Sequence, residues 1–285
     1  MTILVTGATG QLGRLVIDNL IARGVDPATI RAAGRNSDKL AEFASRGLQT
    51  AVIDFEEPGT LVPAFAGVDA LLFVSGSEVG KRMAQHRNAI DAAVAAGVGR
   101  IVYTSAPHAD TTELPVAPEH KATEALLAAS GLPVTILRNN WYTENYVAPL
   151  EQARETGTVV SSAGDGRIAS ATRNDYADAA AVVLSTPGHE GKVYELAGDV
   201  AWSFDDLAAA FSEIIGSQVV YTAIEPEEYA RILRDAGLDE GTVAFVVALD
   251  QATRHGALAD VTGDLSALIG RPTTSLVDGL RAAIA

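Results

Sequence analysis

The chain has 285 residues, 48% of them hydrophobic and 20% charged, a composition that suits one large domain or a domain with an added lobe. It contains no cysteine, which excludes disulfides, thiolate nucleophiles, cysteine-ligated zinc and iron–sulfur clusters. A formal net charge of −15 repels phosphate backbones and anionic lipid, so we expect no nucleic-acid partner. No apolar run approaches the roughly 18 residues of a membrane span, and the first residues lack a signal-peptide pattern. We therefore expect a cytoplasmic protein without membrane insertion.

Short apolar runs alternate with alanine-rich helical stretches through the first half of the chain. The expected strands are 3–6, 30–33, 50–53, 70–75, 100–104 and 134–137, and the clearest expected helices are 12–23, 82–96 and 121–130. Nearly all-apolar strands are typical of a sheet covered on both faces. Gly97 and Gly131 follow two of the helices as C-terminal glycines. This alternation predicts right-handed βαβ units and an α/β fold with a doubly wound parallel sheet, the Rossmann architecture.

The pattern becomes less regular after residue 150. Residues 163–166 predict a turn, Asp175 is a candidate cap for a helix over 176–184, and 193–196 predicts another strand. A helix after Trp202, a strand over 219–222 and acidic helical segments follow, and we expect Glu225, Glu227 and Glu228 to lie on a solvated face. We therefore expect a dinucleotide-binding domain over 1–150 and a smaller α/β lobe over 151–285. The chain is expected to return to the sheet near 175–198.

A glycine-rich turn stands directly after the first expected strand and opens the first expected helix. A dinucleotide's pyrophosphate binds backbone N–H groups at a helix N-terminus, and glycines let the backbone approach the phosphates closely. A purely structural turn is the alternative, but the flanking strand and helix favour cofactor binding. The expected phosphate-binding residues are Gly7, Ala8, Thr9, Gly10, Gln11, Leu12 and Gly13.

The end of the second expected strand indicates which nicotinamide cofactor binds. An NAD-binding unit carries an acidic residue there, but here the strand runs into Arg35. A guanidinium can pair with a 2′-phosphate, which predicts a preference for NADPH over NADH unless Arg35 is simply a surface residue. Asp54 and Phe55 follow the third strand and are expected at the adenine, although Asp54 could equally cap a helix.

Six segments resemble the NmrA-like atypical short-chain reductases. Among these reductases, the resemblance is to the type 2 NAD(P)H:quinone oxidoreductases, with the related triphenylmethane reductases nearby. The segments are 7–13, 75–80, 85–88, 137–146, 163–173 and 194–199. The resemblance implies two-electron reduction of quinones by NADPH without a flavin. Beyond the glycine turn and Arg35 it places these residues at the cofactor: Ser75, Gly76, Ser77, Asn139, Asn140, Trp141, Tyr142, Thr143, Glu144 and Ser170. Gly76 stands where the family pattern leads us to expect a serine.

The tyrosine–lysine pair of ordinary short-chain dehydrogenases is missing, since Ala117 stands four residues before Lys121. A quinone needs only a positioned hydride donor and hydrogen bonds to its developing oxyanion. Candidate donors are Asn139, Asn140 and Tyr142. Trp141 and Tyr146 are candidates for a flat apolar wall against which a ring substrate could pack. The candidate proton donors are His108, His120 and Ser105. Core packing and capping are the alternative roles for these side chains.

Several further expectations concern ligands and partners. His86, His189 and His255 show no metal-ligand spacing, so we expect no metal. Glu78 is interpreted as favouring the dipole of a helix N-terminus. A planar electrophile such as a quinone is the expected substrate, and the sequence is compatible with a homo-oligomer. A redox-sensing regulator that binds NADP without catalysis, and a reductase of a dye or imine, remain alternatives.

Overall fold

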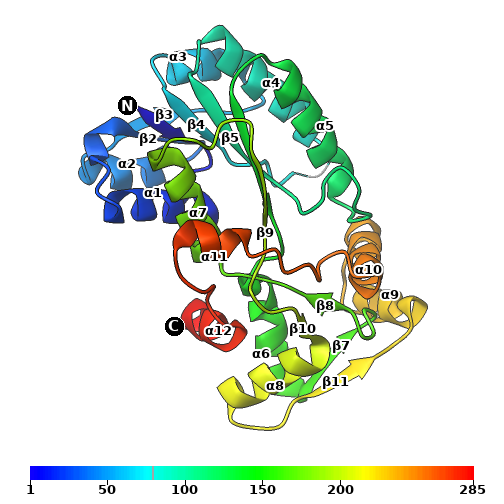
Figure 1. Cartoon of the computed structure of the whole chain (residues 1–285). Coiled ribbons are helices and arrows are strands. Elements are labelled where there is room, and N and C mark those ends of the chain that lie inside the picture. Colours follow the sequence, from blue (N-terminus) through cyan, green and yellow to red (C-terminus); the bar gives the residue numbers. More distant parts are fainter. Residues whose placement is uncertain (79) are drawn as a thin grey trace. The chain divides into compact units, whose positions relative to one another are not determined.

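The computed structural model describes residues 1–78 and 80–285, so Val79 of the 75–80 motif lies outside the described residues (Figure 1). Two compact units are present, and each is built from more than one stretch of the chain. The first comprises residues 1–110, 118–139 and 173–195, and the second comprises 111–117, 140–172 and 196–285. Apart from the short stretch 111–117, the second unit therefore begins at residue 140, and the chain rejoins the first unit at residue 173.

The first unit contains a seven-stranded parallel sheet, which confirms the predicted Rossmann-like fold. In sheet order the strands are β3 (Gln49–Val52), β2 (Ile30–Gly34), β1 (Ile3–Val5), β4 (Ala70–Phe73), β5 (Arg100–Ser105), β6 (Val134–Asn139) and β9 (Val193–Leu196). The order reverses between β1 and β4, where ligands of open α/β sheets bind beyond the carboxyl ends of the strands. Every residue of β1 and β4 is buried, as a sheet covered on both faces requires.

Helices cover this sheet. They are α1 (Gln11–Ala22), α2 (Ser37–Ser45), α3 (Leu61–Phe65), α4 (Arg82–Ala95), α5 (Ala117–Ala129) and α7 (Arg173–Ser185), with short 3-10 turns η1 (Pro27–Thr29) and η2 (Pro58–Thr60). Helix α1 packs on α7 and helix α3 on α4. Gly97 and Gly131 have positive φ after α4 and α5, as predicted. Two predicted helix starts were too late, because α5 begins before Lys121 and because Asp175 lies inside the first turn of α7.

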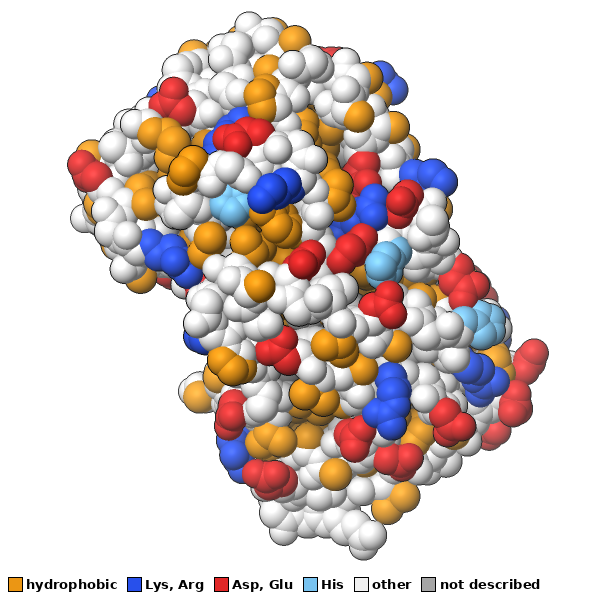
Figure 2. Space-filling model, viewed as in Figure 1, with side chains coloured by type: hydrophobic (Ala, Val, Ile, Leu, Met, Phe, Trp, Pro, Cys, Tyr) orange, Lys and Arg blue, Asp and Glu red, His pale blue; other side chains and the backbone are white. Residues whose placement is uncertain are grey.

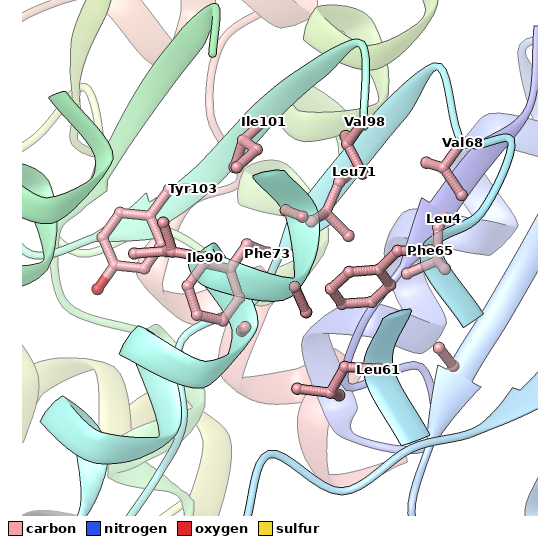
Figure 3. Close-up of a cluster of buried hydrophobic side chains, with 14 of the residues drawn as sticks. Leu4, Leu61, Phe65, Val68, Leu71, Phe73, Ile90, Val98, Ile101 and Tyr103 are labelled. Carbon is pink, nitrogen blue, oxygen red and sulfur yellow. The ribbon is translucent and has the colours of Figure 1, made fainter. Parts of the chain in front are cut away.

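One part of the core lies between the sheet and helices α3 and α4 (Figure 3). Phe65 from α3, Phe73 from β4 and Tyr103 from β5 are almost completely buried in it. The Phe73 ring packs edge-on against Phe55 at 5.5 Å between centroids and lies 5.3 Å from the Tyr103 ring. Because Phe73 ends β4 and Tyr103 lies in the second half of β5, the loops that follow these two strands begin from a rigid base.

The second unit has its own apolar core and two small sheets. Its elements are η3 (Thr143–Tyr146), α6 (Val147–Thr156), β7 (Thr158–Ser161), β8 (Arg167–Ile168), β10 (Trp202–Ser203), α8 (Phe204–Ile215), β11 (Val220–Ala223), α9 (Pro226–Asp235), α10 (Glu240–Arg254), α11 (Asp264–Ile269) and α12 (Leu276–Ile284). Strand β10 pairs antiparallel with β8, and β11 pairs parallel with β7. A capping box between Ser203 and Asp206 starts α8. The expected helix after Trp202 and strand near 219–222 are both present.

Charged side chains of both signs are spread over the surface. Figure 2 shows acidic and basic side chains interspersed over the face in view. Glu225, Glu227 and Glu228 are exposed at and beside the start of α9, which confirms the predicted solvated face. Across the described residues no helix combines the length and apolarity needed to cross a bilayer.

Candidate cofactor and active site

The turn between β1 and α1 is arranged as an anion-binding site. Gly7 has a φ of +60°, and Gly10 N–H donates to the Gly7 carbonyl at 2.9 Å. The first intrahelical bond of α1 runs from Arg14 N–H to the Gly10 carbonyl. The N–H groups just before Arg14 therefore have no acceptor within the helix and point out of its N-terminus. The first turn holds no acidic residue, so the helix dipole is available to an anionic ligand.

Gly13 allows the helix and the turn to approach each other closely. A Cβ built on Gly13 would lie 2.4 Å from the Gly7 carbonyl oxygen and 2.7 Å from the Gly7 carbonyl carbon. These are backbone atoms, so no side-chain rotation could relieve the clash. The three-by-three glycine spacing thus has a direct geometric cause at its first and last positions.

A pocket of about 310 Å³ lies beside this turn and gathers residues from the ends of four strands. The predicted cofactor residues that line it are Gly7, Thr9, Gly10, Gln11, Leu12, Gly13, Arg35, Asp54, Phe55, Ser75, Gly76 and Ser77. The pocket is also lined by five residues that were not predicted at the cofactor: Gly34, Ile53, Val74, Glu78 and Gln85. Ala8 is fully buried, and its N–H donates to the Ala33 carbonyl.

The loop after β4 forms one wall of the pocket and is fixed by its neighbours. Ser75 N–H donates to Thr104 Oγ1 at 2.9 Å, and Gly76 N–H donates to His86 Nε2 at 3.0 Å. Arg82 Nε donates to the Gly76 carbonyl at 2.7 Å. Burial, with the nearby Arg82 charge, lowers the pKa of His86 to about 3. The ring is therefore neutral at neutral pH and can accept the Gly76 N–H.

Two side chains of α4 approach the glycine at position 76. A Cβ there would lie 3.0 Å from Gln85 Oε1 and 3.6 Å from His86 Nε2. The serine that the family resemblance leads us to expect would therefore require Gln85 to move. Gln85 Oε1 is the end of a flexible side chain, so a shift of a few tenths of an ångström would make room, and His86 stands at an ordinary contact distance.

Arg35 stands at the rim of the pocket and pairs with an acidic residue from another loop. Its Nη1 lies 3.1 Å from Glu78 Oε1. The favourable effect of Glu78 on the dipole of the next helix stays a prediction, and its carbonyl accepts the Arg82 N–H at 3.1 Å, which places Glu78 just before α4. Helix α4 begins at Arg82 with Lys81 as its cap, and the Glu78 carboxylate contacts Arg35 and Lys81.

Asp54 and Phe55 follow β3, the strand next to β2, and also line the pocket. Asp54 Oδ1 accepts the N–H of Glu56 at 2.9 Å, and the Phe55 carbonyl accepts Asn88 Nδ2 at 2.8 Å. Asp54 thus shapes a turn and stands in the pocket wall at the same time. The predicted contact of these two residues with adenine remains a prediction.

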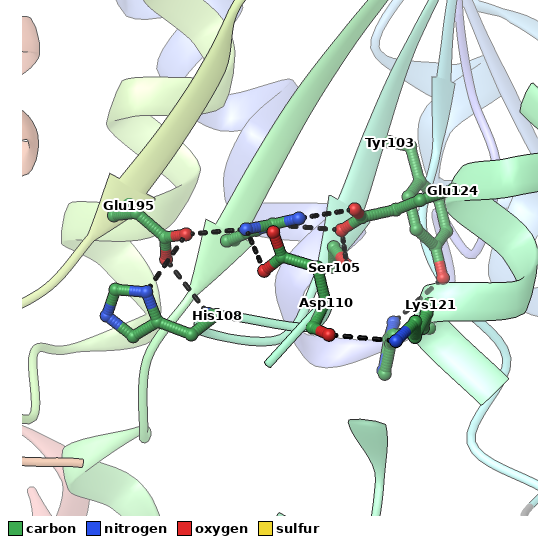
Figure 4. Close-up of polar contacts among 9 residues, drawn as sticks. Tyr103, Ser105, His108, Asp110, Lys121, Glu124 and Glu195 are labelled. Atoms are coloured by element: carbon green, nitrogen blue, oxygen red, sulfur yellow. Dashed lines mark hydrogen bonds and ion pairs between the residues drawn. The ribbon is translucent and has the colours of Figure 1, made fainter. Parts of the chain in front are cut away.

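A buried ionic network occupies the carboxyl edge of the sheet beside β6 (Figure 4). Arg138 donates from Nε and Nη2 to both Glu124 oxygens at 3.0 and 2.6 Å. Its Nη1 donates to Asp110 and Glu195 at 2.8 Å each. Burial disfavours the guanidinium charge, but the hydrogen bonds to Glu124 and Glu195 outweigh it and raise the pKa of Arg138.

His108 is attached to this network in a strained conformation. Its φ is +45°, the left-handed region that a histidine seldom adopts. Its N–H donates to Glu195 Oε2 at 3.0 Å, and its Nδ1 lies 3.4 Å from Glu195 Oε1. Strain of this kind persists only where the surroundings hold it, and it gathers at functional sites.

Two other candidate proton donors are less suitable. His120 is buried with its Nδ1 2.8 Å from the Tyr103 hydroxyl, and burial lowers its pKa to about 3. It is therefore neutral at neutral pH. Ser105 Oγ donates to Glu124 at 2.6 Å and belongs to the Arg138 network.

Asn139 ends β6 in the first unit, whereas the residues that follow it belong to the second. Asn140 Nδ2 donates to the Leu258 carbonyl at 3.2 Å, and Asn140 Oδ1 accepts Trp141 N–H at 2.7 Å. Tyr142 forms an isolated β-bridge with Ala171.

The remaining predicted residues of the second unit lie around η3. Thr143 Oγ1 lies 2.9 Å from Ser170 Oγ, which also accepts Trp202 Nε1 at 2.9 Å. Glu144 lies in the first turn of η3. Tyr146 is buried against Trp202, with 5.0 Å between ring centroids, so it packs the core of this unit. Roles of Asn139–Glu144 and Ser170 at the cofactor remain predictions.

Nothing in the described residues resembles a metal centre, since no three His, Asp or Glu side chains gather as ligands would. The pocket combines backbone amides and the Arg35 guanidinium with the carboxylates of Asp54 and Glu78 and with small polar and apolar side chains. These groups fit a dinucleotide.

Comparison with known proteins identifies the family. The model of the NAD(P)H-binding family matches residues 7–187, which span the glycine turn, the pocket and Arg138. The chain belongs to the NAD(P)H-binding family. The expected relationship to the NmrA-like reductases is confirmed. The prediction that the chain is an NAD(P)H-dependent oxidoreductase is confirmed as well.

Relatives of this NAD(P)H-binding protein match over nearly their whole length. Quinone oxidoreductase 2 of Escherichia coli is 48% identical to this chain, and the alignment covers 98% of this chain and 97% of the relative. The structure of an NADPH-dependent quinone oxidoreductase complexed with NADPH, from the same organism, matches with a TM-score of 0.95 and 47% identity over all of both chains. Triphenylmethane reductase of Citrobacter sp. complexed with NADP(H) matches with a TM-score of 0.94 and 39% identity, over 99% of this chain and 100% of its own.

Proposed function

We propose that the chain reduces quinones by two electrons with NADPH and without a flavin. One observation carries the proposal: the glycine turn, the loop after β4 and Arg35 form a single pocket whose chemistry suits a dinucleotide with a 2′-phosphate. The 48% identity to a quinone oxidoreductase over almost the entire chain supports the choice of substrate.

The residues of the pocket would divide the work of holding the cofactor. N–H groups at the start of α1 bind the pyrophosphate, Arg35 pairs with the 2′-phosphate, and Ser75 and Ser77 border the ribose. Bound NADPH supplies a hydride, which together with one proton converts a quinone to a hydroquinone. The protein holds the acceptor within roughly 3–3.5 Å of the hydride donor and stabilises the oxyanion that develops.

Three residues are proposed to act on the substrate. Asn139 and Tyr142 donate hydrogen bonds to the quinone oxygens, and His108 delivers the proton to the reduced oxygen. Glu195 supports this role of His108, because it holds both the backbone N–H and Nδ1 of that residue. A reduced quinone is stabilised by becoming aromatic, so a strong acid such as the missing tyrosine–lysine pair is not required.

The role of Arg35 predicts a selective loss of NADPH affinity. Arg35→Ala should weaken NADPH binding about tenfold, because one charge-assisted contact with an exposed phosphate is lost. NADH binding should change less than about twofold. Calorimetric titration of each cofactor measures both values. Arg46→Ala removes another exposed arginine, one outside the pocket, and should change neither. Equal losses for both cofactors would contradict the 2′-phosphate role.

Turnover distinguishes the enzyme from a redox sensor. Purified protein is mixed with NADPH and with a panel of quinones and cationic dyes, and the loss of nicotinamide absorbance is followed. We expect oxidation that depends on the quinone. Tight NADPH binding without oxidation by any member of the panel would favour a sensor, and oxidation by dyes alone would favour a different electrophile.

A further inference from the structure

Two opposite charges meet at one point of the pocket wall. Arg35 follows β2, and Glu78 comes from the loop after β4, yet their side chains pair at 3.1 Å and both line the pocket. The end of β2 carries glycine, arginine and asparagine at 34–36 and has no carboxylate of its own. The structure thus brings a carboxylate from a different loop to the arginine expected at the 2′-substituent of the adenosine ribose.

We propose that Glu78 is a specificity-determining residue that lets the site accept NADH as well as NADPH. This rests on the proposed function. With NADH bound, the Glu78 carboxylate accepts a hydrogen bond from the ribose 2′-hydroxyl, as the strand-end acid of an NAD-binding unit does. With NADPH bound, the doubly charged phosphate takes Arg35 from Glu78. NADPH therefore has to break an existing ion pair, whereas NADH leaves that pair in place.

The surroundings of Glu78 make this exchange feasible. Lys81 Nζ lies 3.4 Å from Glu78 Oε2 and 3.2 Å from Glu56 Oε1. A Glu78 carboxylate displaced from Arg35 keeps Lys81 as a partner. Gly76, two residues earlier, is anchored by His86 and Arg82, so the loop keeps Glu78 at the rim.

Glu78→Gln tests the inference, because it removes the charge and keeps the size. Kd values for NADPH and NADH are measured by calorimetry. NADPH should bind about two- to fivefold more tightly, the range for losing one exposed ion pair. NADH should bind about threefold more weakly, because a charged acceptor becomes a neutral one. The ratio of the two Kd values should therefore shift about tenfold toward NADPH.

The matched control is Glu57→Gln, which removes the same charge from an exposed residue outside the pocket and should leave the ratio unchanged. Wild-type protein that binds neither cofactor would defeat the proposed function itself. Wild-type protein that binds NADPH but no NADH would overturn only the inference. The inference would also be overturned by a Glu78→Gln variant whose NADPH and NADH affinities change by the same factor, or by one whose NADPH affinity falls.

Discussion

A Gly13→Ala variant is expected to bind NADPH about 10- to 100-fold more weakly than the wild type and to unfold at a lower urea concentration. The added Cβ would lie 2.4 Å from the Gly7 carbonyl oxygen, so α1 and the turn must separate. Such overpacking costs about 1–3 kcal/mol of folding free energy. Moving N–H groups off the pyrophosphate loses charge-assisted hydrogen bonds of about 1.5–3 kcal/mol each. Calorimetry and urea denaturation measure the two effects.

Gly59→Ala is the control for this variant. A Cβ at Gly59 meets no atom within 4 Å, and the residue lies outside the pocket. It should change neither affinity nor stability by more than about 0.5 kcal/mol. If Gly13→Ala bound NADPH as the wild type does, the close approach of helix and turn would not be what forms the phosphate site.

Arg138→Ala is expected to destabilise the protein by about 3–5 kcal/mol. The substitution leaves the carboxylates of Glu124, Glu195 and Asp110 without the guanidinium that holds them together. Glu124 and Glu195 are largely buried, and an uncompensated buried charge costs far more than an exposed ion pair contributes. Urea denaturation of the apo protein measures the loss as a lower midpoint.

Two further variants separate charge from packing at this network. Arg154 forms an exposed pair with Glu151, so Arg154→Ala should cost less than about 1 kcal/mol. Adding Glu124→Gln to Arg138→Ala should recover part of the stability, because it removes one of the stranded carboxylates. If the double variant were no more stable than Arg138→Ala, lost packing and not stranded charge would explain the effect.

The local features of the first unit could be predicted from the sequence. Apolar runs, helix-ending glycines and the glycine turn act over a few neighbouring residues, and these gave all seven strands of the sheet and the phosphate site. Arg35 could be predicted as well, because its place after β2 follows from the strand pattern. The pocket brings these residues together as the doubly wound fold requires.

Contacts between distant parts of the chain could not be predicted. The Arg35–Glu78 pair joins residues 43 positions apart, and the Arg138 network draws carboxylates from α5, β9 and the loop after β5. No periodicity marks such pairs, because they depend on which strands become neighbours. The interpretation of Glu78 considered only the nearest helix, so its pair with Arg35 was not predicted.

Direct hydride transfer is the central claim, and one measurement tests it most directly. Flavin-free protein is mixed anaerobically with a quinone and NADPH that carries deuterium at the transferring C4 position. We expect one hydroquinone for each NADPH consumed, and a slower rate than with unlabelled NADPH. Oxidation that requires added flavin, or that no quinone elicits, would contradict the account.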